Sequence, residues 1–205
     1  MRPWSALRAA ALGLIWRGSR SHRIGGIDIR LDSSALPEEP KILTRMREAL
    51  DALQEHQSRV LDRARRDLRG VLVIAGVPAP AAYVPFLNVC ALDPKWICSA
   101  AEIELVAGAL IHEATHARLW LSGIRYGSKV RGRVERACMR AECEFLASRQ
   151  EDVLGFREAL RKVIARMPDS DWSDEALRKR NFEHYRAAGV PGWLAKALSY
   201  LDVAA

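Results

Sequence analysis

The chain has 205 residues, 49% of them hydrophobic and 28% charged, so it can bury a core without disulfide bonds. Its four cysteines show no CxxC spacing, which argues against a zinc ribbon or a thioredoxin-like pair and is typical of free thiols in a reducing cytoplasm. The formal net charge of +7 suggests nucleic-acid binding, but the basic residues alternate with acids along helical stretches. That pattern is typical of solvated helix faces, so nucleic acid is not an expected partner.

Residues 1–23 form an N-terminal segment in which a short apolar run, 9–16, is flanked by arginines. The run is too short to span a bilayer, and the sequence after it is a poor signal-peptidase site. A docking helix or a loose terminus is the preferred interpretation, with a basic helix lying on a membrane as the alternative, so the segment stays unassigned. Residues 24–205 are expected to form a single domain located in the cytoplasm.

The spacing of apolar residues predicts a helix-rich chain with a small sheet. In chain order we expect a strand at 24–31, a helix at 41–69, strands at 71–75 and 83–92, and helices at 99–121, 128–167, 173–188 and from 191 onward. The first strand should bury Ile27, Ile29 and Leu31 on one face, and the long helix should break near His56. Pro85 lacks a backbone N–H, which favours a sheet edge for the 83–92 strand.

The sheet is followed directly by the helix that carries the most informative motif of the sequence. Ser99 and Glu102 stand at the spacing of a capping box, in which the two side chains satisfy free backbone N–H groups at a helix start. Gly123 is positioned to end this helix. The chain is therefore expected to be an α+β protein, mostly helical, with its small sheet immediately before the motif helix.

Residues His112, Glu113, Ala114, Thr115 and His116 form an HExxH motif inside this helix. Residues four apart share a helix face, so both histidines can bind one zinc ion. Glu113 lies about 100° around the helix, from where it can deprotonate a metal-bound water without binding the metal. The helix is apolar nearly all round and is expected to be buried, where a histidine pair and a carboxylate need a partner such as a metal.

A third ligand is expected from the helix downstream. Leu119 stands where a three-histidine metzincin site would need a glycine, so that class is excluded. Glu135 and Glu142 lie about 20° apart on an otherwise apolar arc, whereas Glu144 points outward. Two carboxylates on an apolar face are costly unless they bind a cation or its ligands. We rank Glu135 as the third ligand, and Glu142 as an outer residue that hydrogen-bonds a histidine or as the alternate ligand.

This arrangement resembles the gluzincin metallopeptidases of the aminopeptidase N type. Eighteen residues separate His116 from Glu135, which gives the HExxH-x18-E pattern of that family. The stretches 111–119 and 135–138 also resemble small bacterial peptidase-like proteins with no assigned substrate. The resemblance implies a zincin-like fold, in which the edge strand of a sheet, here 83–92, binds peptide beside the active-site helix and a second helix supplies the third ligand.

The resemblance covers residues 71–146, a little over a third of the chain. Arg118 occupies a position that is usually apolar in the family. The tryptophan- and asparagine-rich segment of the aminopeptidases and the GxMxN exopeptidase loop are both missing from the sequence. Aminopeptidase activity is therefore not implied.

A donor that faces the metal-bound oxyanion is also expected, by analogy a tyrosine, histidine or arginine. Tyr126, His184 and Tyr185 are the candidates, although each type of residue more often serves in packing or at the surface. Cys138, one turn from Glu135, is within reach of the metal, but a small buried core thiol is the preferred interpretation.

The leading functional hypothesis is a zinc-dependent metallopeptidase acting on a peptide or protein substrate. The first alternative is a catalytically inactive zincin that serves as a metal-binding regulatory or interaction module. Glu113 argues against that alternative because metal binding does not need it. A non-peptidase hydrolase or toxin-like effector on the same scaffold is a second alternative, and a DNA-binding protein with an incidental motif is a third. The sequence predicts neither the substrate nor the oligomeric state.

Overall fold

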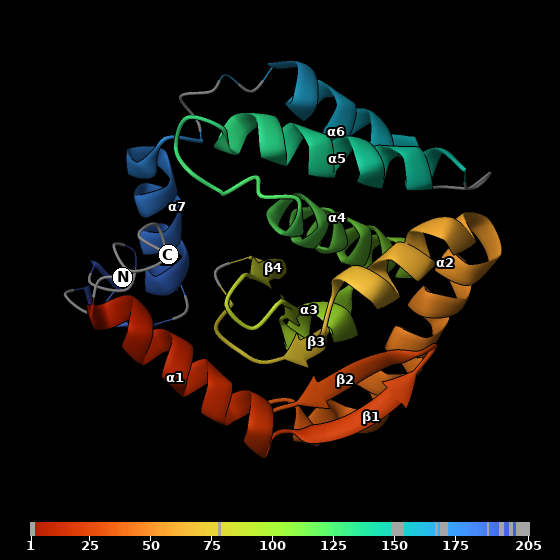
Figure 1. The fold of residues 1–205 in the computed structure, drawn as a ribbon, viewed down its shortest axis with the longest axis horizontal. Coiled ribbons are helices and arrows are strands. Elements are labelled where there is room, and N and C mark those ends of the chain that lie inside the picture. Colours follow the sequence, from red (N-terminus) through yellow and green to blue (C-terminus); the bar gives the residue numbers. More distant parts are fainter. Residues whose placement is uncertain are drawn as a thin grey trace.

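The computed structural model is about 65% helical and contains one small mixed sheet, which confirms the mostly helical α+β class (Figure 1). It describes residues 3–77, 79–148, 154–166, 168, 172–187, 189–192, 195–196 and 199. Its elements in chain order are α1 (Pro3–Gly18), β1 (Arg20–Ile24), β2 (Ile27–Leu31), the 3-10 helix η1 (Leu36–Glu38), α2 (Glu39–Asp67), β3 (Gly70–Val73), β4 (Ala81–Val84), β5 (Val89–Leu92), α3 (Pro94–Ser99), α4 (Ile103–Leu121), α5 (Arg131–Ala147), α6 (Leu154–Arg166) and α7 (Asp174–Ala187).

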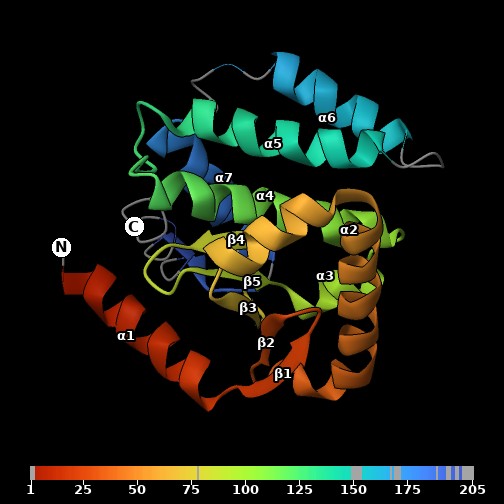
Figure 2. The same ribbon diagram turned by 45° about the vertical axis from the view of Figure 1, so that its right-hand side comes forward.

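The five strands are arranged in the order β1-β2-β3-β5-β4. β2, β3 and β5 run parallel to one another, whereas β1 and β4 pair antiparallel to their neighbours at the two edges. Every residue of β3 and of β5 is buried, because these interior strands are covered on both faces. The sheet thus presents β4 as the edge strand next to the motif helix, as Figure 2 shows from the side.

The strand predicted at 24–31 is instead a hairpin, because the chain reverses inside it. Gly25 and Gly26 both have positive φ angles, 54° and 83°, which a glycine adopts without steric cost. β1 consequently begins at Arg20. It therefore spans the boundary that the sequence predicts between the N-terminal segment, 1–23, and the domain, 24–205. The alternating face of β2 is buried, as predicted.

The strand predicted at 83–92 is also wrong as a single element. Residues 85–88 form a turn, and Asn88, with a φ of 57°, lets the chain return antiparallel. Pro85 begins this turn, so the edge position inferred from it holds for β4 but not for β5. The break predicted near His56 in the long helix is confirmed one residue later, at Gln57, whose φ and ψ of −145° and 48° are not helical.

The predicted capping box is wrong because Ser99 ends a separate short helix, α3. Asp93 caps that helix by accepting a hydrogen bond from the N–H of Trp96 at 3.0 Å, and Pro94 follows at the first helical position. α4 then begins after Glu102 without a side-chain cap. Its end agrees with the prediction, because Gly123 has a φ of 86°.

The helix predicted at 128–167 is two helices, α5 and α6, which lie side by side in Figures 1 and 2. α5 ends at Ala147, where the hydroxyl of Ser148 donates to the carbonyl of Phe145 at 2.6 Å. The helix predicted at 173–188 is confirmed as α7. The helix predicted from residue 191 lies partly outside the described residues.

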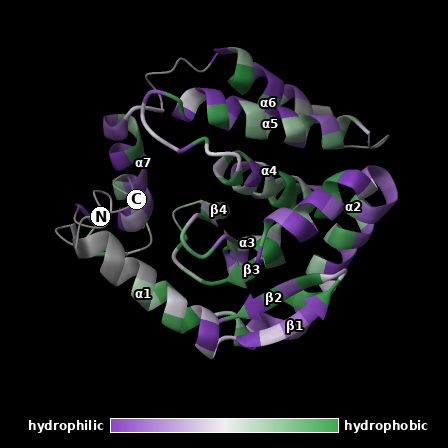
Figure 3. Ribbon diagram, in the orientation of Figure 1, coloured by the Kyte–Doolittle hydropathy of each residue, from purple (hydrophilic) through white to green (hydrophobic). Residues whose placement is uncertain are grey.

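The motif helix α4 is buried, as its apolar sequence predicted. It packs against α2, α5, β4 and β5, and its core-facing residues are fully or nearly fully buried: Val106, Ala107, Leu110, Ile111 and Ala117. Figure 3 shows alternating hydrophilic and hydrophobic bands along α2 and α5, as expected of amphipathic helices that cover a core. At the N-terminal end of the chain, Trp16 anchors α1 by packing against Leu72 and Val89.

Candidate metal centre

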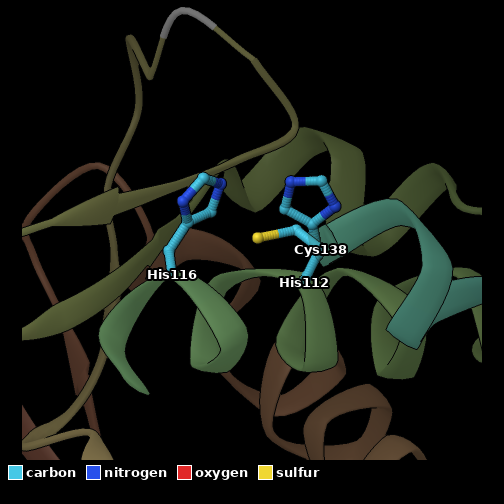
Figure 4. A group of neighbouring side chains, drawn as sticks. All are labelled: His112, His116 and Cys138. Atoms are coloured by element: carbon cyan, nitrogen blue, oxygen red, sulfur yellow. The ribbon is translucent and has the colours of Figure 1, made fainter. Parts of the chain in front are cut away.

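The two histidines of the motif rise from adjacent turns of α4 and face the same space (Figure 4). The ring centroids of His112 and His116 are 5.1 Å apart, as expected for residues four apart on a helix. Both residues are half-buried. Side chains of α5 and the backbone of β4 lie beside the two histidines. These neighbours determine what the pair can bind.

Glu135 of α5 lies between the two imidazole rings. Its Oε2 is 3.4 Å from Nε2 of His112, and its Oε1 is 3.6 Å from Nε2 of His116. A tetrahedral zinc site with bonds of about 2.0–2.2 Å has neighbouring ligand atoms about 3.3–3.6 Å apart. These three residues therefore have the donor types of a zinc site, and each histidine nitrogen lies at about ligand spacing from one oxygen of Glu135.

Glu142, two turns further along α5, contacts the other nitrogen of His112. Its Oε2 is 3.3 Å from Nδ1, where it can accept a hydrogen bond and fix the ring with Nε2 toward the shared space. Gly108 of α4 makes room for this side chain, since a Cβ there would lie 3.2 Å from Cγ of Glu142. The two carboxylates that the sequence placed on one face thus contact different nitrogens.

Cys138 lies on α5 between these two carboxylates and is fully buried. Its sulfur and one nitrogen from each of His112 and His116 all lie within 4.8 Å of one another, so this group of three could bind a metal ion. The thiol is buried, as the sequence suggested, but it faces the histidines rather than the apolar core alone (Figure 4). Two donors of α5, an oxygen and a sulfur, therefore accompany the histidine pair.

Glu113 is buried on the side of α4 that faces the edge strand. The backbone N–H of Tyr83 in β4 donates a hydrogen bond to its carboxylate. Burial raises the pKa of Glu113, and the nearby His112 and His116 oppose that rise only in part. The residue is thus held next to the histidines as a carboxylate more basic than an exposed one.

The charges around the histidines are strongly coupled. Burial alone would lower the pKa of His112, but hydrogen bonds to Glu135 and Glu142 outweigh it and raise that pKa well above the ordinary value. Burial would likewise raise the pKa of Glu135, whereas its hydrogen bonds to the two histidines lower it. Protons and a metal ion therefore compete for the same nitrogens.

Tyr126, one of the three candidate donors, belongs to this site. Its hydroxyl donates to Oε1 of Glu135, and its ring lies edge-on to His116 with centroids 5.4 Å apart. Burial, followed by the charge of Glu135, raises the pKa of Tyr126, so the hydroxyl stays protonated as a donor. The guanidinium carbon of Arg131 lies 4.9 Å from the centre of the tyrosine ring.

Arg131 connects this tyrosine to the C-terminal part of the chain. One of its nitrogens donates to the carbonyl of Trp172 at 2.9 Å and to Asp174 at 2.8 Å. This links α7, which Asp174 begins, to the loop that carries Tyr126. No sequence pattern identifies Arg131, because its hydrogen-bond partners are more than forty residues away.

A cavity of about 1140 Å³ opens onto the histidines and is walled mostly by apolar side chains. Its walls come from α1, from the segment between β3 and β4, and from β4, α4, α5 and α7. Tyr185 of α7 lines this cavity, whereas its neighbour His184 does not. Of the three candidate donors, the structure therefore brings Tyr126 to the histidines and Tyr185 to the cavity wall.

The chain matches no model of a known protein family, and searches of curated proteins and of solved structures likewise found no match. The likeness to gluzincins consequently stays a hypothesis carried by the motif and its downstream glutamate. Among the residues that the structure describes, no helix combines the length and the apolar character needed to cross a bilayer.

Proposed function

We propose that the protein is a zinc-dependent hydrolase that cleaves peptide bonds. The observation that carries this proposal is the placement of Glu135 against Nε2 of both motif histidines, with Glu113 buried beside them. A chance HExxH sequence has no reason to meet a carboxylate from another helix at ligand spacing. The combination is what a zinc hydrolase needs: three ligands and a separate base.

Zinc suits this set of donors because it accepts nitrogen and oxygen ligands in tetrahedral geometry. With three protein ligands, a bound zinc would keep one position for water and would lower the pKa of that water to near neutrality. Glu142 would hold His112 in the tautomer that exposes Nε2 to the metal. The ligands proposed are His112, His116 and Glu135.

Glu113 is proposed as the general base. Its raised pKa makes it a better proton acceptor near neutral pH, and its hydrogen bond to β4 fixes its position. It would accept a proton from the attacking water at a carboxylate oxygen and deliver it to the leaving amine. Tyr126 has a protonated hydroxyl beside the site and is proposed to donate to the developing oxyanion.

The substrate is proposed to be a peptide segment with apolar side chains. β4 is a sheet edge whose outer side can pair with an extended chain, and it lies beside α4. The cavity next to it has apolar walls and exceeds the volume of most small-molecule sites. A peptide with one or two bulky apolar side chains would fit both features.

Zinc content and cleavage of an unbiased peptide library, measured on the same sample, test the proposal. We expect about one zinc per chain, because the three ligands form one site, and cleavage that stops when a chelator removes the metal. His112→Ala should lose both zinc and cleavage. Stable, metal-free protein with no zinc affinity would refute the proposal.

A second function, metal binding without turnover, is favoured by one observation. Cys138 lies within 4.8 Å of a nitrogen of each histidine, so together with Glu135 it would make four protein ligands, which are typical of structural zinc sites without a position for water. The same library experiment separates the two functions. Stoichiometric zinc without cleavage of any peptide would support the structural role.

A further inference from the structure

Cys138 shares the face of α5 that meets the motif histidines. It follows Glu135 by three residues and precedes Glu142 by four, so the three side chains form one row toward α4. The thiol is fully buried, and Figure 4 shows its sulfur pointing into the space between the two imidazole rings. The sulfur and one nitrogen of each ring lie within 4.8 Å of one another.

We propose that Cys138 is a fourth protein ligand of the metal and that its thiolate occupies the water position in the resting protein. The inference rests on the proposed function, because it concerns the same metal. Zinc accepts thiolate at about 2.3 Å together with histidine and carboxylate ligands. His112, His116 and Cys138 lie together within 4.8 Å, and Glu135 contacts both histidines, so all four donors surround the same histidine pair.

With His112, His116, Glu135 and Cys138 as ligands, the metal in the resting protein has no position left for water. When the sulfur binds the metal, the thiol proton leaves to solvent or to a nearby carboxylate. Opening reverses both changes: the sulfur–metal bond breaks, the sulfur takes up one proton, and a water molecule binds in its place. Turnover therefore requires the thiolate to leave first, so the protein holds its metal more tightly and hydrolyses more slowly than a three-ligand site would.

Cys143 provides a matched control on the same helix. It is also buried, but it lines a different cavity, between α5 and α6, together with Arg140, Glu144 and Arg161. A serine at either position keeps the size of the side chain and removes the soft sulfur donor. Differences between Cys138→Ser and Cys143→Ser therefore report on the metal rather than on the loss of a buried thiol.

Cobalt(II) substitution tests the inference by spectroscopy. A cobalt–thiolate bond gives a sulfur-to-metal charge-transfer band in the near ultraviolet, and nitrogen and oxygen ligands do not. We expect this band in the wild-type protein and in Cys143→Ser, and its loss in Cys138→Ser with the visible cobalt bands retained. Cobalt affinity should fall in Cys138→Ser by more than the roughly 10–100-fold typical of changing a residue outside the ligand shell.

The outcomes separate this inference from the proposed function. Bound cobalt without a charge-transfer band in the wild type would overturn the thiolate ligand and leave the hydrolase proposal standing. A band that persists in Cys138→Ser would overturn it too. Failure of the wild type to bind cobalt or zinc would instead remove the metal centre itself, and with it both proposals.

A second variant guards against misfolding. Cys138→Ala should show the same loss of the band as Cys138→Ser, while circular dichroism and thermal unfolding of the metal-free proteins match the wild type within the small change expected of one buried atom. With saturating zinc, Cys138→Ser should cleave peptide faster than the wild type. Unchanged or slower cleavage would contradict the closed resting state.

Discussion

Glu135 and Glu142 come from the same face of α5 but contact different nitrogens of the motif. Glu135 faces Nε2 of both histidines, whereas Glu142 faces Nδ1 of His112. Where a histidine binds a metal through one nitrogen, a carboxylate on the other nitrogen sets the tautomer and the ring orientation. The two carboxylates are therefore expected to differ in how strongly they affect metal binding.

Substituting each carboxylate by alanine tests this difference. We expect Glu142→Ala to weaken zinc binding by about 10–100-fold, the usual effect of removing an orienting partner. Glu135→Ala should weaken it further, because a ligand is lost. Competition with a fluorescent zinc chelator measures both affinities, and a larger effect of Glu142→Ala would reverse the assignment.

Sequence periodicity placed some site residues and missed others. The positions of His112 and His116 follow from helix geometry alone, and Glu135 follows from a carboxylate on an apolar arc. Tyr83 and Arg131 act through contacts with segments distant in sequence, the motif helix and α7 respectively, which periodicity cannot reveal. The hydrogen bond from Tyr83 to Glu113 and the link from Arg131 to α7 are therefore visible only in the structure.

At the scale of elements, the site depends on how closely α5 approaches α4. Gly108 lies at that contact, and an added Cβ would be 3.2 Å from Cγ and 3.3 Å from Oε1 of Glu142. Those distances are tighter than ordinary van der Waals contact, so a larger residue must displace the glutamate. The absence of a side chain at this position thus keeps Glu142 against His112.

Valine at position 108 should consequently act through Glu142. We expect Gly108→Val to weaken zinc binding by about 10–100-fold, similar to Glu142→Ala, and to add nothing when combined with it. Gly13→Val is the control, because nothing lies within 4 Å of a Cβ at that helical glycine. Additive losses in the double variant would show that Gly108 acts by another route.

Helices could be predicted from the sequence where apolar residues recur at helical spacing over a long stretch. α2, α4 and α7 have long stretches with clear spacing or composition, and their existence was correctly predicted. The first hairpin differs from the predicted single strand because β1 is mostly polar, so its pairing with β2 around Gly25 and Gly26 has no strand pattern in the sequence. The second differs because the apolar residues Phe86 and Leu87 continue through its turn at Asn88. The separation of α5 from α6 was missed for a similar reason, since no glycine or proline marks residues 147–153.

At the scale of the whole molecule, the coupled charges link stability to pH. The raised pKa of His112 means that its contribution to stability is complete below its unfolded value of 6.5 and is lost as pH rises through the folded value. Glu113, whose pKa is also raised, changes stability in the same direction. The lowered pKa of Glu135 contributes stability above its unfolded value of 4.5 that is lost as pH falls through the folded value.

Bound zinc should oppose the decrease in the free energy of unfolding as pH rises. In a chelator, the free energy of unfolding is expected to decrease from about pH 6 to about pH 8, because the unfolded chain loses the proton of His112 in this range while the folded chain holds it more tightly. With zinc it should decrease less or increase, because the metal binds neutral histidine and its affinity rises with pH. Urea unfolding at both pH values, with and without zinc, measures the difference; parallel pH profiles would contradict the shared site.

Whether the metal performs catalysis depends on one carboxylate that the metal does not need. Glu113→Gln keeps the size of the side chain and leaves His112, His116 and Glu135 in place, but it removes the basicity required to deprotonate water. Zinc content and peptide cleavage should be measured on the same preparations of wild type and variant. We predict equal zinc and thermal stability, with cleavage reduced at least about 10²–10⁴-fold. Cleavage by the zinc-loaded variant at the wild-type rate would contradict the role of Glu113 as the general base.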